Sequence, residues 1–108
     1  MKLNNKPFTM IKNGRKNIEL RLYDEKRRKL NIGDEIIFEN LEDGETISVT
    51  VLALHKYESF AALYKHFDKS AMGYEDNEIA NPDDMNEYYT PEKQKQYGVV
   101  GIEISLNK

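Results

Sequence analysis

The sequence predicts an α+β fold in which short helices are inserted among the strands of one sheet. About five segments have the composition of strands, and two of them flank the tight turn Glu42-Asp43-Gly44. Short helical segments separate the others. The regular strand–helix alternation of a doubly wound parallel sheet is missing. We therefore expect 108 residues to form a single domain, 1–108, with one modest core.

The first third of the chain predicts a short strand at residues 1–3 and then a short helix. Lys6-Pro7 opens this helix, and Gly14 suits its C-terminal end. Residues 17–23 alternate strictly, which predicts a strand with one apolar face. The apolar face consists of Ile18, Leu20 and Leu22, and the other face of Asn17, Glu19, Arg21 and Tyr23.

The middle of the chain predicts two strands followed by a helix. A charged connection at 24–30 and a turn at 31–34 precede strands at 35–39 and 46–54. Ser59 is a natural N-cap for the helix. The apolar spacing extends that helix to residue 67 and assigns its buried face to Phe60, Leu63, Tyr64 and Phe67.

The last third begins with an acidic, irregular segment at residues 68–81, which we expect to be a surface loop. Such a loop can act as a lid carrying a carboxylate. Two brief helices follow, each with proline after a capping residue, at Asn81-Pro82 and Thr90-Pro91. Gly98 ends the second helix, and residues 99–106 read as a final strand.

The composition excludes several kinds of covalent, catalytic and metal-binding site. Without cysteine there is no disulfide, thiol nucleophile or thiolate metal site. His55 and His66 alone do not make a histidine metal cluster, and no Asp-x-Asp-x-Asp-Gly calcium loop occurs. We expect no metal and no cofactor. No leader or membrane-spanning run is evident, so we expect a cytoplasmic protein with no membrane partner.

The net charge of −3 conceals an uneven distribution. Residues 1–32 hold ten Lys or Arg against three acids, whereas residues 33–108 hold six against sixteen. A local basic region on an acidic protein favours a small anionic ligand over non-specific tracking along nucleic acid.

Residues 14–21, Gly-Arg-Lys-Asn-Ile-Glu-Leu-Arg, match the Gly-x-Lys-x-x-Glu-x-Arg signature of the ASCH domain family. The match continues through the turn Ile32-Gly33-Asp34 and resumes at residues 55–60 and 97–104. The chain thus resembles small bacterial stand-alone ASCH proteins over essentially its whole length.

This resemblance implies a PUA-like fold, a small mixed β-barrel of about five strands flanked by short helices. It also implies a cleft beside the motif and a link to RNA or nucleosides. Some members of the family are RNA-binding modules, and others cleave RNA or remove an acyl group from a modified cytidine. We therefore expect an RNA- or nucleotide-binding protein with a basic cleft, and a small hydrolase as the alternative.

The motif side chains are the candidate site. Arg21 offers a planar fork of donors for phosphate or a base edge, and Glu19 can accept from an amine or a 2′-hydroxyl. Lys16 can contact phosphate or, if its pKa is lowered, act as a nucleophile or base. In an enzyme, Lys16 and Glu19 would be catalytic. The alternative is a solvated strand face whose Glu and Arg neutralise each other. The deacylating members carry a hydroxyl residue in place of Glu19, which weakens the case for their particular reaction.

Secondary contacts are expected from Tyr23, Arg27, Arg28 and Lys56. The basic run at residues 26–29 is either a phosphate clamp on the cleft rim or a solvated loop. Tyr23 either stacks on a base or packs at the strand end. His55 is expected to be structural. Near the C-terminal helices, the side chains that either pack half-buried or form a stacking wall are Tyr88, Tyr89, Glu92 and Tyr97.

Overall fold

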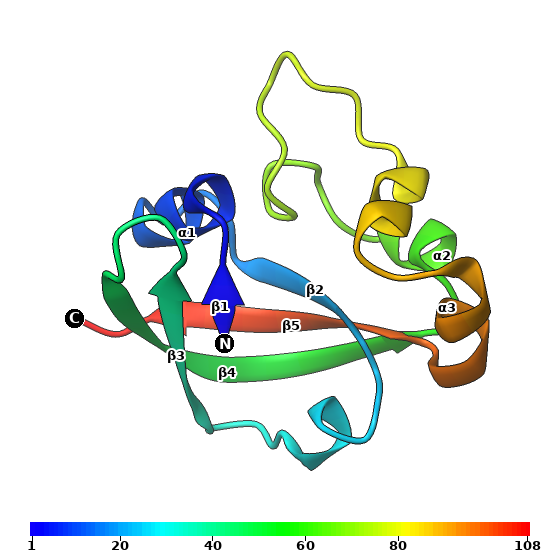
Figure 1. Ribbon diagram of the computed structural model, residues 1–108, viewed down its shortest axis with the longest axis horizontal. Helices are drawn as coiled ribbons and strands as arrows, with labels where there is room; N and C mark the ends of the chain where they lie inside the picture. The colour runs from blue at the N-terminus through cyan, green and yellow to red at the C-terminus, as the bar shows by residue number, and fades with distance from the viewer.

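The computed structural model describes all 108 residues and contains one mixed five-stranded sheet (Figure 1). Its strands run in the order β1-β3-β4-β5-β2. β1 is parallel to β3, and every other pairing is antiparallel. The strands are β1 (Lys2–Leu3), β2 (Ile18–Leu22), β3 (Glu35–Asn40), β4 (Thr46–Tyr57) and β5 (Val99–Leu106).

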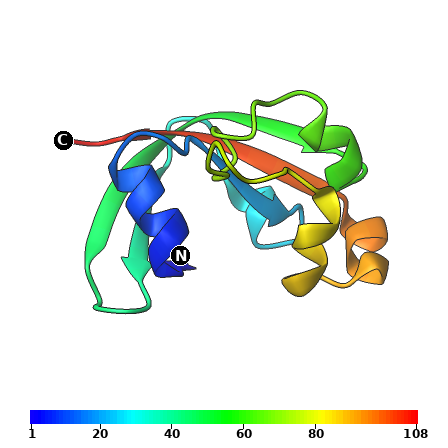
Figure 2. The ribbon, with the colours of Figure 1, turned by 90° about the horizontal axis from the view of Figure 1, so that it is seen from above.

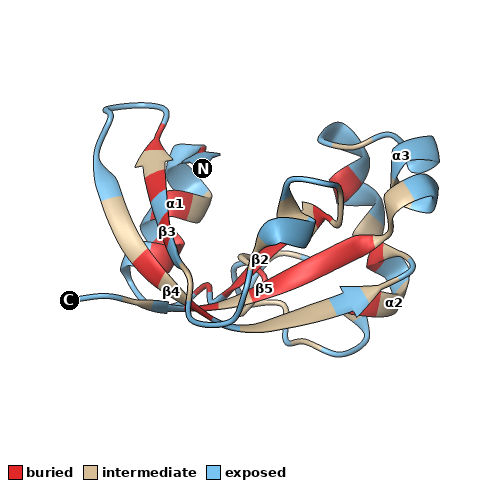
Figure 3. Ribbon diagram, turned by 90° about the horizontal axis from the view of Figure 1, so that it is seen from below, coloured by how far each residue is buried: buried red, intermediate tan, exposed pale blue.

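The long strand β4 joins the two halves of the sheet. Its first residues pair with β3, and Val49–Tyr57 pair with β5. The register shifts between Val51 and Ala53, and such an irregularity bends a strand and increases its twist. The sheet therefore curves into a half-barrel with an arm on each side, as Figure 3 shows. The predicted α+β class is confirmed.

Short helices occupy the connections. The α-helices are α1 (Asn5–Lys12), α2 (Phe60–Tyr64) and α3 (Pro91–Tyr97), and the 3₁₀ helices are η1 (Arg27–Lys29) and η2 (Pro82–Glu87). Figure 2 shows α1 near one end of the sheet and η2 with α3 near the opposite end. The predicted caps are present, because the side chains of Ser59, Asn81 and Thr90 each accept a backbone N–H of the following helix.

Two details differ from the sequence-based expectation. The helix beginning after Ser59 ends at Tyr64, because Phe67 instead packs edge-on against the rings of His55 and Tyr57 on β4. The charged connection after β2 contains the 3₁₀ turn η1, whose first amide, Arg27 N, donates to the Asp24 carboxylate.

The apolar residues form two clusters, one for each arm of the half-barrel. The first lies under α1 and contains Phe8, Phe38 and Ile102. The second lies under α2 and contains Leu20, Phe60 and Leu63. β2 stands between the arms, and the side chains of both its faces are covered. No helix of the structure is both long and apolar enough to cross a membrane.

Gly98 ends α3 and leads directly into β5. It has φ +73° and ψ −175°, a conformation that is essentially restricted to glycine. A Cβ at this position would lie 3.1 Å from the carbonyl oxygen of Tyr57. This oxygen belongs to β4 and cannot move without disturbing the sheet.

We predict that Gly98→Ala destabilises the protein by about 2–4 kcal/mol, since backbone strain adds to the steric contact. Gly44→Ala is the matched control, because Gly44 has φ +77° but open space around its Cβ position. It should cost only about 1–2 kcal/mol. Urea denaturation of both variants measures the difference, and equal losses would contradict the role of the Tyr57 contact.

Candidate functional site

A cleft of about 580 Å³ lies between α1, β1 and β2 on one side and the segment from Met72 to Tyr89 on the other. The motif residues Lys16, Glu19 and Arg21 all line it. Its other charged lining residues are Lys2, Lys6, Glu78, Asp84 and Glu87, and its tyrosines are Tyr64, Tyr74, Tyr88 and Tyr89.

The motif side chains form a buried ionic network. Glu19 Oε1 lies 3.1 Å from Lys16 Nζ, and Glu19 Oε2 accepts from Arg21 Nε at 3.0 Å and Nη2 at 2.8 Å. The side chain of Glu19 is 4% exposed, against 7% for Lys16 and 14% for Arg21. Both carboxylate oxygens are therefore directed at cations rather than at open solvent.

Local structure explains why these three residues meet. Glu19 and Arg21 share one face of β2 because side chains alternate along a strand. Their cross-strand partners on β5 are Ile102 and Val100, which belong to the first apolar cluster. Lys16 precedes β2, where its backbone N–H donates to Met10 O at the end of α1. The network thus sits where α1 meets the sheet.

The segment around Met72 covers Lys16 from above. The amides of Asn17 and Ile18 both donate to Ala71 O, which docks this segment on the start of β2. Lys16 Nζ donates to Met72 O at 3.2 Å. Gly73 has φ +104°, and a Cβ there would lie 3.0 Å from the Lys16 stem. The positive φ favours glycine here, and a Cβ would press against the Lys16 stem.

Charge decides the protonation of the network. Burial raises the pKa of Glu19, but the charges and hydrogen bonds of Lys16 and Arg21 outweigh it and hold that pKa below its ordinary value. For Arg21, burial lowers the pKa, yet the neighbouring Glu19 and, to a lesser degree, Tyr89 raise it overall. Glu19 is therefore an anion and a weak base in this setting.

The two walls of the cleft differ in character. The wall built from residues 2–21 carries Lys2, Lys6, Lys16 and Arg21, with Glu19 as its single acid. The wall built from residues 64–89 carries the four tyrosines and three acids. Four cations and four anions line the cleft in total. The cleft is therefore polarised from wall to wall, whereas the sequence suggested a basic cleft.

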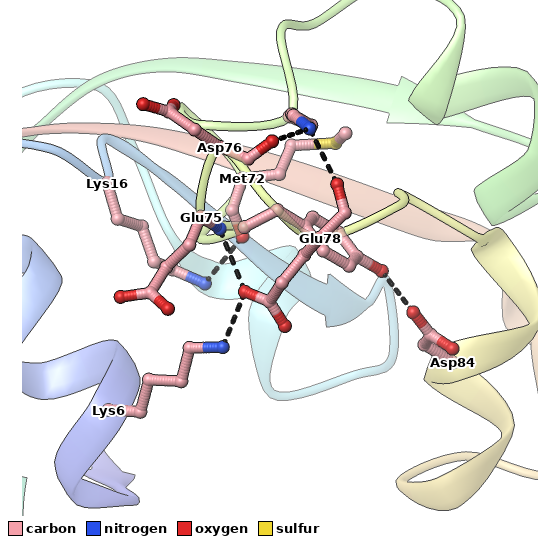
Figure 4. A network of polar contacts seen from close by, with 9 residues as sticks. Lys6, Lys16, Met72, Glu75, Asp76, Glu78 and Asp84 are labelled. Carbon is pink, nitrogen blue, oxygen red and sulfur yellow. Dashed lines mark hydrogen bonds and ion pairs between the residues drawn. The ribbon is translucent and has the colours of Figure 1, made fainter.

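An ion pair crosses the mouth of the cleft, as Figure 4 shows. Lys6 Nζ of α1 lies 2.6 Å from Glu78 Oε1, which also accepts the amide of Glu75. Lys69 Nζ donates to the carbonyls of Asp76 and Glu78. The acidic segment at 68–81 is thereby held in a defined conformation beside Lys16.

The second wall is ordered by a tyrosine network. The Tyr74 hydroxyl lies 3.0 Å from the Tyr64 hydroxyl and donates to Asp84 Oδ2 at 2.7 Å. Burial is the first cause that raises the pKa of Tyr74, and the bonds to Tyr64 and Asp84 add to it. Tyr89 stacks on Phe60 with ring centroids 6.3 Å apart.

The structure does not bring the expected secondary contacts to this cleft. Tyr23, Arg27, Arg28 and Lys56 are absent from its lining and gather beyond the end of β2. Arg27 pairs with Asp24 at 3.2 Å. The Tyr23 ring is contacted by Arg28 and Lys56, 4.4 and 5.0 Å from its centroid, instead of lying open for a base. His55 pairs with Glu103 and packs on Phe67, also outside the cleft.

Sequence reasoning missed Lys2 and Lys6, and it assigned Tyr64 to the core. Tyr64 follows the apolar helical spacing, so only the half-buried position of its ring next to Tyr74 reveals a second role. Tyr88 and Tyr89 do line the cleft, whereas Tyr97 does not. No group of three or more His, Asp or Glu side chains is placed to hold a metal ion.

We predict that Glu19→Gln destabilises the protein by about 3 kcal/mol, because two nearly buried cations lose their counter-charge. Glu45→Gln is the control, since it removes an exposed ion pair with Lys12 and should cost about 0–1 kcal/mol. Urea denaturation at neutral pH measures both variants.

We predict that the difference in unfolding free energy between wild type and Glu19→Gln depends on pH and is smaller in acid. A carboxylate with a lowered folded-state pKa stabilises above its unfolded pKa of about 4.3, and this contribution is lost as the pH falls through the folded pKa. The difference between wild type and Glu19→Gln should therefore shrink in acid. A difference that is constant down to the acid limit would contradict the ionic origin of the effect.

The comparisons with known proteins agree with this architecture. A family model described as the ASCH domain matches residues 1–108. The crystal structure of hypothetical protein PH0355 is 33% identical, with a TM-score of 0.79, and the match covers 99% of this chain and 100% of the other. The solution NMR structure of protein PF0455 from Pyrococcus furiosus is 31% identical, with a TM-score of 0.66 and coverage of 100% and 99%.

No curated protein matches the chain. The predicted resemblance and the PUA-like half-barrel are nevertheless confirmed, because the family model spans the whole chain and the similar structures share its fold throughout. The chain belongs to the ASCH domain family, which is generally linked to RNA binding.

Proposed function

We propose that the cleft binds one nucleotide unit, either free or as part of an RNA. The observation that carries this proposal is the polarity of the cleft, with cations on one wall and tyrosines and acids on the other. A nucleotide has the matching polarity, since its phosphate is anionic and its base has an aromatic face and polar edges. The link of the family to RNA supports the same ligand class.

The basic wall would hold the phosphate. Lys2 and Lys6 are exposed at the mouth, and Arg21 reaches the cleft from β2. Arg21 is held by two hydrogen bonds to Glu19 and one to Lys2 O, so little side-chain freedom is lost when it meets an anion. Cations positioned in advance favour binding because their ordering cost is already met by the fold.

The tyrosine wall would hold the base. Tyr88 is 61% exposed at the cleft edge, which leaves its ring free to stack. Tyr89 is fixed against Phe60. Stacking on an aromatic side chain stabilises a bound base by about 1–3 kcal/mol. Asp84 and Glu87 on the same wall are acceptors for donors on the base edge.

In this proposal Glu19 positions Lys16 and Arg21 rather than reading the ligand. The sequence suggested that Glu19 accepts from a donor on the ligand, but Lys16 and Arg21 already occupy both of its oxygens. Glu19 carries one negative charge and Lys16 and Arg21 carry two positive charges, so the network has a net charge of +1. That residual charge faces the cleft and favours an anion there.

A second candidate function is hydrolysis of RNA or of an acylated nucleoside. The specific observation in its favour is that Lys16 is buried and lies 3.1 Å from a carboxylate oxygen. Such a pair can transfer a proton when a ligand separates the two charges. The lowered pKa of Glu19 argues against it as a resting general base, so binding remains the first proposal.

We predict that Lys6→Ala weakens nucleoside monophosphate binding about tenfold, through the loss of one charge-assisted contact. Lys16 and Arg21 are less suitable for this test because they neutralise Glu19 and their removal affects folding. Titration calorimetry with the four ribonucleoside monophosphates makes the measurement.

Lys12→Ala is the matched control. Lys6 and Lys12 both lie on α1, are 52% and 51% exposed, and pair with a glutamate, but only Lys6 lines the cleft. Equal affinities for the two variants, or no nucleotide binding by the wild type, would overturn the proposal.

Hydrolysis is tested by detecting a reaction product rather than by measuring binding. If the second candidate function holds, mass spectrometry detects a product when wild-type protein is incubated with a panel of modified nucleosides and short RNAs. That product should vanish with Lys16→Met, which keeps the packed stem and leaves Glu19 paired with Arg21. Binding without any product would contradict a hydrolase.

A further inference from the structure

A second group of cations lies outside the cleft, beyond the end of β2. Lys26, Arg28 and Lys29 belong to the segment around η1, and Lys56 lies near the end of β4. All four are exposed. We call these four residues the η1 patch. Arg27 is not included, because Asp24 neutralises it.

Tyr23 organises the η1 patch. Its ring packs against the first apolar cluster, while the guanidinium of Arg28 and the ammonium of Lys56 contact the same ring. Arg28 Nη2 also donates to Tyr97 O at 3.3 Å. Cation–π contacts of this kind favour defined positions for both side chains. The remaining donors of Arg28 and all three of Lys56 are left for a ligand.

The η1 patch lies next to the basic wall of the cleft along the chain. Tyr23 follows Arg21 by two residues, and in an extended strand this separation is about 6.8 Å along one face. The amino group of Met1, which donates to Ile37 O, is close enough to both groups to respond to their charges. Burial is the main cause that lowers its pKa, and the nearby charges of Arg21, Lys26 and Arg27 lower it further. Arg21 of the basic wall and Lys26 of the η1 patch thus act on one common group.

We propose that the η1 patch binds the phosphodiester backbone of a single-stranded RNA whose neighbouring nucleotide occupies the cleft. This inference rests on the proposed function of the cleft. It makes the ligand an oligonucleotide, since a free nucleotide fills only the cleft and does not reach the η1 patch. Arg28 and Lys56 act as phosphate contacts, and Tyr23 acts as their support rather than as a base-stacking residue.

The chemistry of the rest of the chain favours a short single strand over a long duplex. Residues 33–108 carry sixteen acids against six basic residues, so most of the chain repels a polyanion. The polar cleft accepts an unpaired base, whereas a paired base would have its edge occupied. Four cations in one patch match a few consecutive phosphates.

Fluorescence anisotropy with a labelled single-stranded RNA of about eight nucleotides tests the inference, since sites on single strands span about 4–16 nucleotides. The test variant is the double substitution Arg28→Gln and Lys56→Gln. Its matched control is Lys93→Gln with Lys95→Gln, two exposed lysines on α3 outside both groups. All four positions are exposed, and thermal melting verifies that both variants fold.

We expect the Arg28/Lys56 variant to bind the RNA about tenfold more weakly than wild type. The slope of log affinity against log salt should fall by about 1.4, for two lost phosphate contacts on a single strand. Nucleoside monophosphate binding should be unchanged in this variant, and the Lys93/Lys95 control should match wild type in every assay.

The outcomes separate the two proposals. Equal RNA affinity for the Arg28/Lys56 variant and the control would overturn the η1 patch while leaving the cleft intact. RNA binding that depends on the η1 patch, with no monophosphate binding and no effect of Lys6→Ala, would overturn the cleft as a nucleotide site. Wild type that binds neither RNA nor monophosphates would overturn both.

Discussion

The buried carboxylate of Glu19 is the constraint on which the site depends. An isolated anion in this position would be strongly unfavourable, and here two cations and three close contacts compensate for its desolvation. Satisfying Glu19 fixes the side chains of Lys16 and Arg21 at the same time. The network thereby links the end of α1 to β2, and through Arg21 and Lys2 O it also reaches β1. One ionic requirement therefore fixes two of the four cations of the basic wall.

The opposite wall depends on how the segment after α2 docks. Two amides of the residues leading into β2 bind Ala71 O, and Gly73 allows the backbone to lie directly on the Lys16 stem. Lys6 and Glu78 then join this segment to α1 across the mouth. The acidic segment is consequently part of the site's architecture, because the same contacts that bury Lys16 also place the tyrosines and acids of the second wall opposite the cations.

The half-barrel explains why cations that are close in sequence lie in two separate regions of the surface. Lys16, Arg21 and Arg28 lie within thirteen positions, yet the first two line the cleft and the third lies beyond the end of β2. β2 is an edge strand that begins beside Lys16 and ends at Leu22, just before Tyr23 and the η1 patch, so its length separates the two places. The proposed RNA binding would use both places, with one nucleotide in the cleft and the adjoining phosphodiester backbone on the η1 patch.

Much of the fold was determined by local sequence. The alternation of residues 17–23, the capping residues Ser59, Asn81 and Thr90, and the turn before residue 46 predicted elements that the structure contains. The motif identified Lys16, Glu19 and Arg21 as a group. Alternation specifies which side chains share a face, but not what covers that face. Only the tertiary structure decided that Glu19 is buried, because the covering segment comes from residues 71–74. Likewise, Lys6, Glu78 and Tyr88 meet at one cleft through long-range packing, which no local pattern encodes.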